Sequence, residues 1–172
     1  SILFQSRLID ERQVRMIEAI KHRRSIRKFE NKPVEDEKLN KILEAARLAP
    51  SGNNRQPWFF IIIKDDIVKQ ELAVATSNQM WLAHAPLVIV AVADLVARGE
   101  GFAGMYIDED SGLADVKSII RDTTIPITQI LLEVDNQGLG ACWCGAFKQK
   151  DVRPVLGIPG DKYVLAVIPV GY

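Results

Sequence analysis

Three arginines and a serine within five residues form the densest group of anion-binding side chains in the sequence. Arg23, Arg24, Ser25 and Arg27 follow a predicted helix. Planar guanidinium groups form bidentate hydrogen bonds with phosphate oxygens, and the serine hydroxyl adds a further donor. This cluster therefore suits the binding of one phosphate. A solvated basic turn is the alternative. Because the apolar Ile26 lies inside the cluster, we expect the segment to rest on the protein core.

A second segment, APSGNNRQPW at residues 49–58, is dense in hydrogen-bonding groups and in residues that permit turns. A strand is predicted directly after it. Such a loop can wrap the polar edge of a ligand. The alternative is an ordinary connection between a helix and a strand.

A third segment, GLGACWCGAF at residues 138–147, combines glycines with small apolar residues. Residues without bulky side chains let backbone amides approach a flat ligand closely. The alternative is a tightly packed strand. The sequence alone leaves both possibilities open.

In this order and spacing, the three segments resemble those of the FMN-dependent nitroreductase family. The resemblance extends from about residue 20 to residue 172 and is weak over 95–117. It implies a nitroreductase-like α+β fold, with a central mixed or antiparallel sheet flanked by helices. It also implies an intertwined homodimer with FMN at the subunit interface. Independently, no Gly-x-Gly-x-x-Gly follows a first strand, which argues against a Rossmann domain.

The resemblance assigns contacts to each part of FMN. The basic segment is expected to contact the phosphate and the ribityl chain through Arg23, Arg24 and Ser25, and Arg27 is expected to lie near flavin N1 and O2. The other expected contacts come from three further segments: the loop residues Pro50, Ser51, Gly52 and Asn54 of the other subunit, Gln79 or Asn78 at the pyrimidine edge, and Cys144, Gly145 and Ala146, whose backbone faces N5 and O4.

Family members also carry a basic residue for the phosphate beyond the last strand. The sequence ends at Tyr172, so Arg23 and Arg24 are expected to carry more of the phosphate charge.

The activity implied by the resemblance is hydride transfer from NADH or NADPH, through flavin N5, to a nitroaromatic, a quinone or a similar electron-poor acceptor. A cation near N1 stabilises the negative charge of reduced flavin, and a backbone N–H aimed at N5 orients that atom. We assign no catalytic acid or base; Arg27 and the backbone of Gly145 are expected to tune the ring. Reductive dehalogenation, flavin modification and FMN binding without turnover remain alternatives on the same scaffold.

Helices and strands must bring these segments together. Apolar periodicity predicts helices over 9–21, 36–48, 67–75, 119–136 and 149–156, with a short one over 79–83. Pro126 is expected to start or kink its helix. Continuous apolar runs predict buried strands over 58–63 and 87–93, and a last strand over 163–170. The glycine-containing residues 95–117 are expected to form a lid or variable loop within a single domain spanning 1–172.

Charge and cysteine content restrict the class of protein. Lys and Arg number 22 and Asp and Glu number 22, and the resulting zero net charge disfavours nucleic-acid and membrane-surface partners. Cys142 and Cys144 are expected to be buried on one strand face; they are too close for an unstrained disulfide, and the distant His22 and His84 do not complete a metal site. Without a secretory pattern or a long apolar run, a cytoplasmic protein is expected.

Overall fold

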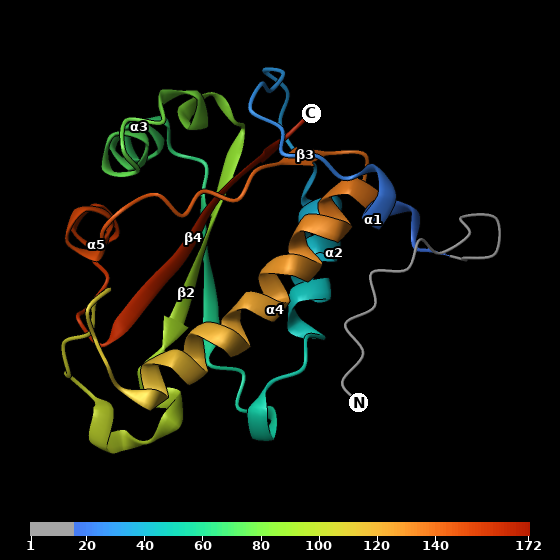
Figure 1. The fold of residues 1–172 in the computed structure, drawn as a ribbon. Coiled ribbons are helices and arrows are strands. Elements are labelled where there is room, and N and C mark those ends of the chain that lie inside the picture. The colour runs from blue at the N-terminus through green and yellow to red at the C-terminus, as the bar shows by residue number, and fades with distance from the viewer. Residues whose placement is uncertain (1–15) are drawn as a thin grey trace, which may run out of the picture.

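The computed structural model describes residues 16–172, which form an α+β fold with helices on both faces of one sheet (Figure 1). The elements are α1 (Glu18–His22), α2 (Asp36–Arg47), β1 (Trp58–Ile63), α3 (Asp66–Ala75), β2 (Leu87–Asp94), α4 (Ala114–Asn136), β3 (Gly140–Ala141), α5 (Gln149–Leu156) and β4 (Lys162–Gly171). Among the described residues, no helix is both long enough and apolar enough to cross a membrane.

The sheet has the strand order β1-β2-β4-β3, and each neighbouring pair is antiparallel. The two central strands pair along their whole length, from Leu87 opposite Val170 to Asp94 opposite Lys162. The short β3 pairs near the Val170 end, and β1 begins near the other end with Trp58 opposite Ala93. The two ends of the sheet therefore carry different loops, and this separation decides the layout of the candidate site.

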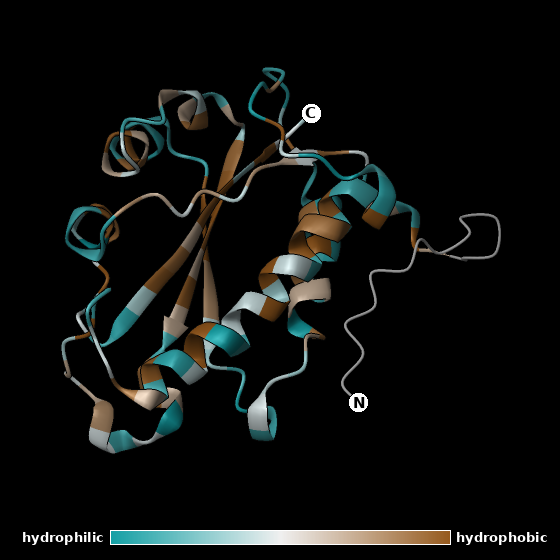
Figure 2. Ribbon diagram, viewed as in Figure 1, coloured by the Kyte–Doolittle hydropathy of each residue, from teal (hydrophilic) through white to brown (hydrophobic). Residues whose placement is uncertain are grey.

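Strand alternation divides the core into two apolar layers. One layer joins Ile89, Ile168 and their same-face neighbours to the apolar sides of α2 and α4. The other joins Val90, Val167 and their neighbours to α3 and α5. Successive strand residues point to opposite faces, so a continuous apolar run fills both layers at once. The brown faces of the helices in Figure 2 accordingly turn towards the sheet.

Several predicted elements are confirmed. The helices α2, α3 and α5 begin and end within one residue of their predicted bounds, and α5 ends at Gly157 in the left-handed conformation (φ 62°). The short helix predicted over 79–83 is a 3-10 turn, Met80–His84. Of the helix predicted over 9–21, the structure shows α1 at Glu18–His22, and residues before 16 lie outside the described range.

The prediction of a buried strand over 58–63 is wrong in its burial. The strand β1 has the predicted bounds, but it lies at the edge of the sheet. Of its six residues only Ile63 is buried, and Phe59 is 37% exposed. An apolar run predicts a strand that is covered on both faces. It does not reveal the order of the strands in the sheet, and an edge strand such as β1 has a neighbouring strand on one side only.

The prediction that Pro126 starts a helix is also wrong, and the alternative of a kink at Pro126 stays a prediction. The helix α4 begins at Ala114 and continues through the buried Pro126 to Asn136. Proline inside a helix removes one backbone hydrogen bond at a cost of roughly 3 kcal/mol. The long buried side of α4, which includes Ile119, Ile127 and Ile130, outweighs that cost.

The segment predicted as a lid or variable loop is partly attached to the core. It contains 3-10 turns at Leu95–Arg98 and Glu100–Phe102, and its last four residues belong to α4. Ile107 is fully buried in a small cluster with Val116 and Ile119. Its carbonyl accepts a hydrogen bond from the buried Arg153 of α5. A lid motion would have to break these contacts.

Gly140 provides a test of the close contact between β3 and the basic segment. A Cβ atom at this position would lie 2.7 Å from Cγ1 of Ile26. We expect Gly140→Ala to lower the free energy of unfolding by about 1–3 kcal/mol through overpacking. Gly112→Ala is the control, because a Cβ there meets no atom within 4 Å. Thermal or denaturant unfolding measures both, and equal stability of the two variants would contradict the contact.

Candidate functional site

The basic segment lies against the edge of the sheet formed by β3. Ser25 forms a parallel bridge with Ala141, and the amide of Ile26 donates to the Ala141 carbonyl over 2.9 Å. The Ile26 side chain packs below Gly140. The sequence-based expectation that this segment rests on the core is therefore confirmed, and the guanidinium groups project from a fixed backbone.

The cations of this segment have no anionic partner within residues 16–172. Neither Arg23, Arg24, Arg27 nor Lys28 forms an ion pair there. Among the described residues, the Arg24 guanidinium donates only to backbone carbonyls, that of Lys21 over 2.8 Å and that of Arg23 over 2.9 Å. Closely spaced like charges are unfavourable unless an anion neutralises them. This charge surplus fits a phosphate-bearing group.

The arginines face two different cavities. Arg23 and Arg24 line one of about 320 Å³, beside β3 and Tyr172. Arg27 lines another of about 810 Å³, where its guanidinium carbon lies 5.8 Å from the centre of the Trp81 ring. That distance suits a cation–π contact. Arg23 and Arg24 thus share one position and Arg27 occupies another. No sequence pattern indicates the contact between Arg27 and Trp81.

The late glycine segment continues after β3 as residues 142–147, an irregular stretch beside β4 that we call the strap. Cys144 and Val167 exchange two backbone hydrogen bonds of 3.0 Å, which turns the Cys144 side chain into the core. The next two residues, Gly145 and Ala146, are exposed, and within the described chain their amides donate to no backbone acceptor. Exposed amides on a fixed strap fit hydrogen bonding to a flat ligand.

Unusual backbone angles gather in two of the predicted binding segments. The non-glycine residues with positive φ in the described chain are Asn53, Asn54, Gln56, Ser77 and Asn78, at 48–59°. Such conformations cost of order 1 kcal/mol each and are often retained at functional sites. Sequence reasoning did not select Ser77, although a Ser-Asn pair directly after a helix is a turn signal.

The turn after α3 is tied to the strap. The Ser77 hydroxyl donates to the Ala146 carbonyl over 2.7 Å. Gln79, a predicted cofactor contact, donates its side-chain amide to the Thr76 carbonyl over 2.9 Å and is half-buried. Asn78 is exposed and makes no side-chain hydrogen bond to the described residues. Of the two side-chain amides proposed for the pyrimidine edge, that of Asn78 is therefore the more available to a ligand.

The loop at residues 50–56 lies at the opposite end of the sheet from the basic segment (Figure 1). The carbonyl of Pro57 accepts from the Asp94 amide over 2.9 Å, and the Gly52 amide donates to Asp122 over 3.3 Å. Strand residues rise about 3.4 Å each, so Leu87 and Ala93 place the two ends roughly 20 Å apart. A single chain does not bring Pro50, Ser51, Gly52 and Asn54 to the arginines.

The two cysteines are buried thiols in the layer below α3 and α5, so their predicted burial is confirmed, but β3 ends at Ala141 and the two cysteines do not lie on a face of that strand. Burial, reinforced by the neighbouring Cys142, raises the pKa of the Cys144 thiol from 9.0 to about 12. Because the pKa is higher in the folded chain, this thiol leaves stability unchanged below about pH 9 and lowers it as pH rises towards 12.

We therefore expect Cys144 to resist a thiol reagent at pH 8 in the native protein and to react at once after unfolding. Kinetics of modification by a chromogenic disulfide, measured on a Cys142→Ala variant, isolate this thiol. Rapid native labelling at pH 8 would show a reactive cysteine and contradict the burial argument.

Comparisons with known proteins agree with the fold and with the resemblance to a known family. Residues 20–172 match the model of the Nitroreductase family. A protein of Thermus thermophilus named NADH dehydrogenase is 31% identical over 174 residues, covering 87% of this chain and 82% of the relative. A nitroreductase family protein of Clostridium novyi superimposes with a TM-score of 0.76 at 31% identity, over 92% of this chain and 84% of that one. An FMN-dependent nitroreductase of Clostridium difficile does so with a TM-score of 0.73 at 32% identity, over 91% and 87%. The chain belongs to the nitroreductase family.

Proposed function

We propose that this protein is an FMN-dependent oxidoreductase that takes hydride from NADH or NADPH and passes it to a nitroaromatic, a quinone or a similar electron-poor acceptor. The observation that carries the proposal is the set of guanidiniums at Arg23, Arg24 and Arg27, which form no ion pair within residues 16–172 and are fixed beside a strap whose Gly145 and Ala146 are exposed. Membership of the family, and the similarity to a solved FMN-dependent nitroreductase, support FMN as the anionic ligand.

Each part of the site has a distinct task in this proposal. Arg23 and Arg24 neutralise the phosphate, and the Ser25 hydroxyl contacts the ribityl chain. Arg27 supplies positive charge at the pyrimidine end, and Gly145 and Ala146 direct backbone amides towards N5 and O4. FMN, when bound, supplies two-electron chemistry by accepting hydride from a nicotinamide and giving it to the acceptor. The side chains of this protein bind and orient the reactants and set the local charge.

We further propose that the site is completed in a homodimer, with residues 50–54 supplied by the partner subunit. The separation of roughly 20 Å between this loop and the arginines supports an arrangement in trans. Exposed apolar side chains support a partner surface: Ile17 is 66% exposed and Leu48 is 64% exposed, and both line a hollow of about 380 Å³ between α1, α2 and α4. A cytoplasmic location stays a prediction.

The visible spectrum of the purified protein tests the cofactor, and anaerobic reduction tests the activity. We expect flavin bands that are released as FMN on denaturation and that bleach when NADH or NADPH is mixed in without oxygen. A colourless protein that ignores added FMN would refute the proposal. Tight FMN binding without bleaching by either nucleotide would identify a non-catalytic flavin-binding protein.

Acceptor screening then separates the alternative reactions. The reduced protein is mixed under nitrogen with a nitroaromatic, a quinone and a halogenated phenol, and separately exposed to air. Reoxidation by the nitroaromatic or quinone supports the proposed acceptor class. Halide release would identify reductive dehalogenation, and loss of the flavin itself in air would identify a flavin-modifying enzyme.

A further inference from the structure

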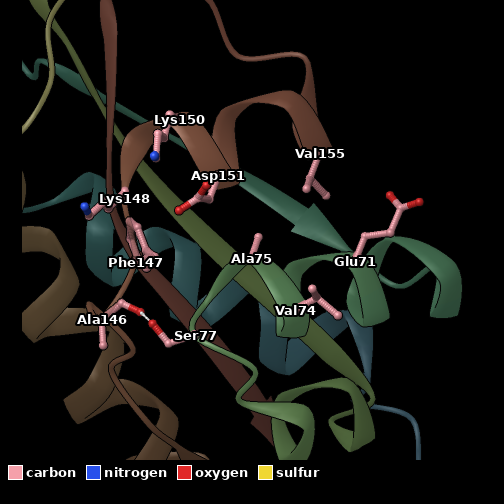
Figure 3. A pocket seen from close by; sticks show the side chains of 10 residues that line it. All are labelled: Glu71, Val74, Ala75, Ser77, Ala146, Phe147, Lys148, Lys150, Asp151 and Val155. Carbon is pink, nitrogen blue, oxygen red and sulfur yellow. Dashed lines mark hydrogen bonds between the residues drawn. The ribbon is translucent and has the colours of Figure 1, made fainter.

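A cavity of about 860 Å³ lies between α3 and α5 (Figure 3). Of the residues proposed to contact FMN, only Ala146 lines it. Its walls are partly apolar, with Val74 and Ala75 on α3 and Phe147 and Val155 on the other side. The volume is in the range of small-molecule sites. The Ser77 hydroxyl, which donates to the Ala146 carbonyl over 2.7 Å, fixes the strap at its border. The cavity therefore continues directly from the proposed N5-facing strap.

Charged side chains are unevenly distributed around this cavity. Lys148 and Lys150 lie beside Phe147 at the end near the strap, while Glu71 lies at the far end on α3, and Asp151 lies between the two ends (Figure 3). None of these four side chains forms an ion pair within residues 16–172. Two cations thus lie near the strap, and the carboxylates of Asp151 and Glu71 lie farther along the cavity between its apolar walls.

We propose that this cavity binds the adenosine diphosphate part of the nicotinamide nucleotide and that Glu71 makes the enzyme prefer NADH over NADPH. The inference rests on the proposed function. Lys148 is two residues after Ala146, so a pyrophosphate held by the lysines leaves the nicotinamide beside the strap. The adenosine then extends along the apolar walls towards Glu71.

Charge balance decides between the two nucleotides. The two lysines match the two negative charges of the pyrophosphate, and the described residues that line the cavity include no further cation for a third phosphate. A carboxylate accepts hydrogen bonds from the ribose hydroxyls of NADH, as acidic residues do in other dinucleotide sites. The same carboxylate repels the 2′-phosphate of NADPH, and Asp151 adds to this repulsion.

Steady-state kinetics of the FMN-loaded protein test the assignment. We compare kcat/KM for NADH and NADPH, each normalised to the reduction rate with a dihydronicotinamide that lacks ribose and phosphate. The wild type is expected to favour NADH. Glu71→Lys should shift the NADH/NADPH ratio towards NADPH by about ten- to a hundredfold, and Glu71→Gln should shift it less in the same direction. The double variant K148A/K150A should raise the KM for both nucleotides without reversing the preference.

Lys117→Ala, an exposed lysine on α4, is the matched control and should change neither nucleotide's kinetics. A wild type that favours NADPH, a Glu71→Lys variant with an unchanged ratio, or a lysine variant with an unchanged KM would each overturn the inference while leaving the proposed function standing. If bound FMN is reduced neither by the nucleotides nor by the small dihydronicotinamide, the proposed function itself fails and this inference fails with it.

Discussion

The double variant R23A/R24A is expected to bind FMN about a hundred- to ten-thousandfold more weakly than the wild type. Each guanidinium makes charge-assisted hydrogen bonds to the phosphate worth about 1.5–3 kcal/mol, and about 1.4 kcal/mol corresponds to a tenfold change in affinity. Both side chains line the same cavity and neither has a carboxylate partner in the described chain that would take over the charge. Titration of apoprotein, followed by quenching of FMN fluorescence, measures the dissociation constant.

Two arginine variants calibrate this result. Arg121→Ala removes an exposed arginine from α4 and should leave FMN affinity unchanged. Arg27→Ala should lower the reduction potential of bound FMN more than Arg23→Ala does, because loss of a cation near N1 destabilises the negative charge of reduced flavin. Equal effects of Arg27→Ala and Arg23→Ala on the potential would mean that phosphate binding and ring tuning were wrongly assigned to separate residues.

Mixing two inactive variants is expected to restore activity if the site is assembled from two subunits. R23A/R24A damages the basic segment, and Asn54→Asp replaces an amide donor of the distant loop with a negative charge. Asp tolerates the left-handed conformation of Asn54 (φ 53°). After unfolding, mixing and refolding, random pairing gives mixed dimers in which one site carries both defects and the other carries none. About a quarter of all sites should then be intact.

The measurement is reduction of an acceptor at an FMN concentration that saturates the wild type but neither variant. Asn53→Asp provides the matched loop control, because Asn53 is exposed, has a similar φ of 54° and was not assigned to the cofactor. Activity that never exceeds the sum of the two separate variants would contradict assembly in trans. It would require the loop and the arginines to meet within one chain by a large rearrangement of the sheet.

Most of the helices and strands could be predicted from residues that are neighbours in the chain. The apolar spacing of Leu39, Ile42 and Ala46 predicts α2 within one residue, because one face of a helix repeats every three to four residues. Apolar runs likewise placed β2 and β4. The order of the three sequence segments at 23–27, 49–58 and 138–147 was sufficient to identify the family, which the comparisons confirm. All of these properties depend on residues that are close together in the chain.

The placement of those elements relative to one another depends on the folded chain. The apolar run of β1 predicts a strand, but strand order put it at the edge, where Phe59 is 37% exposed. Pro126 favours a helix start, but α4 begins at Ala114 and continues through Pro126, because a long buried face packs against the core. Strand direction put residues 50–56 at one end of the sheet and the arginines at the other. Such outcomes depend on contacts between distant parts of the chain, which local periodicity does not encode.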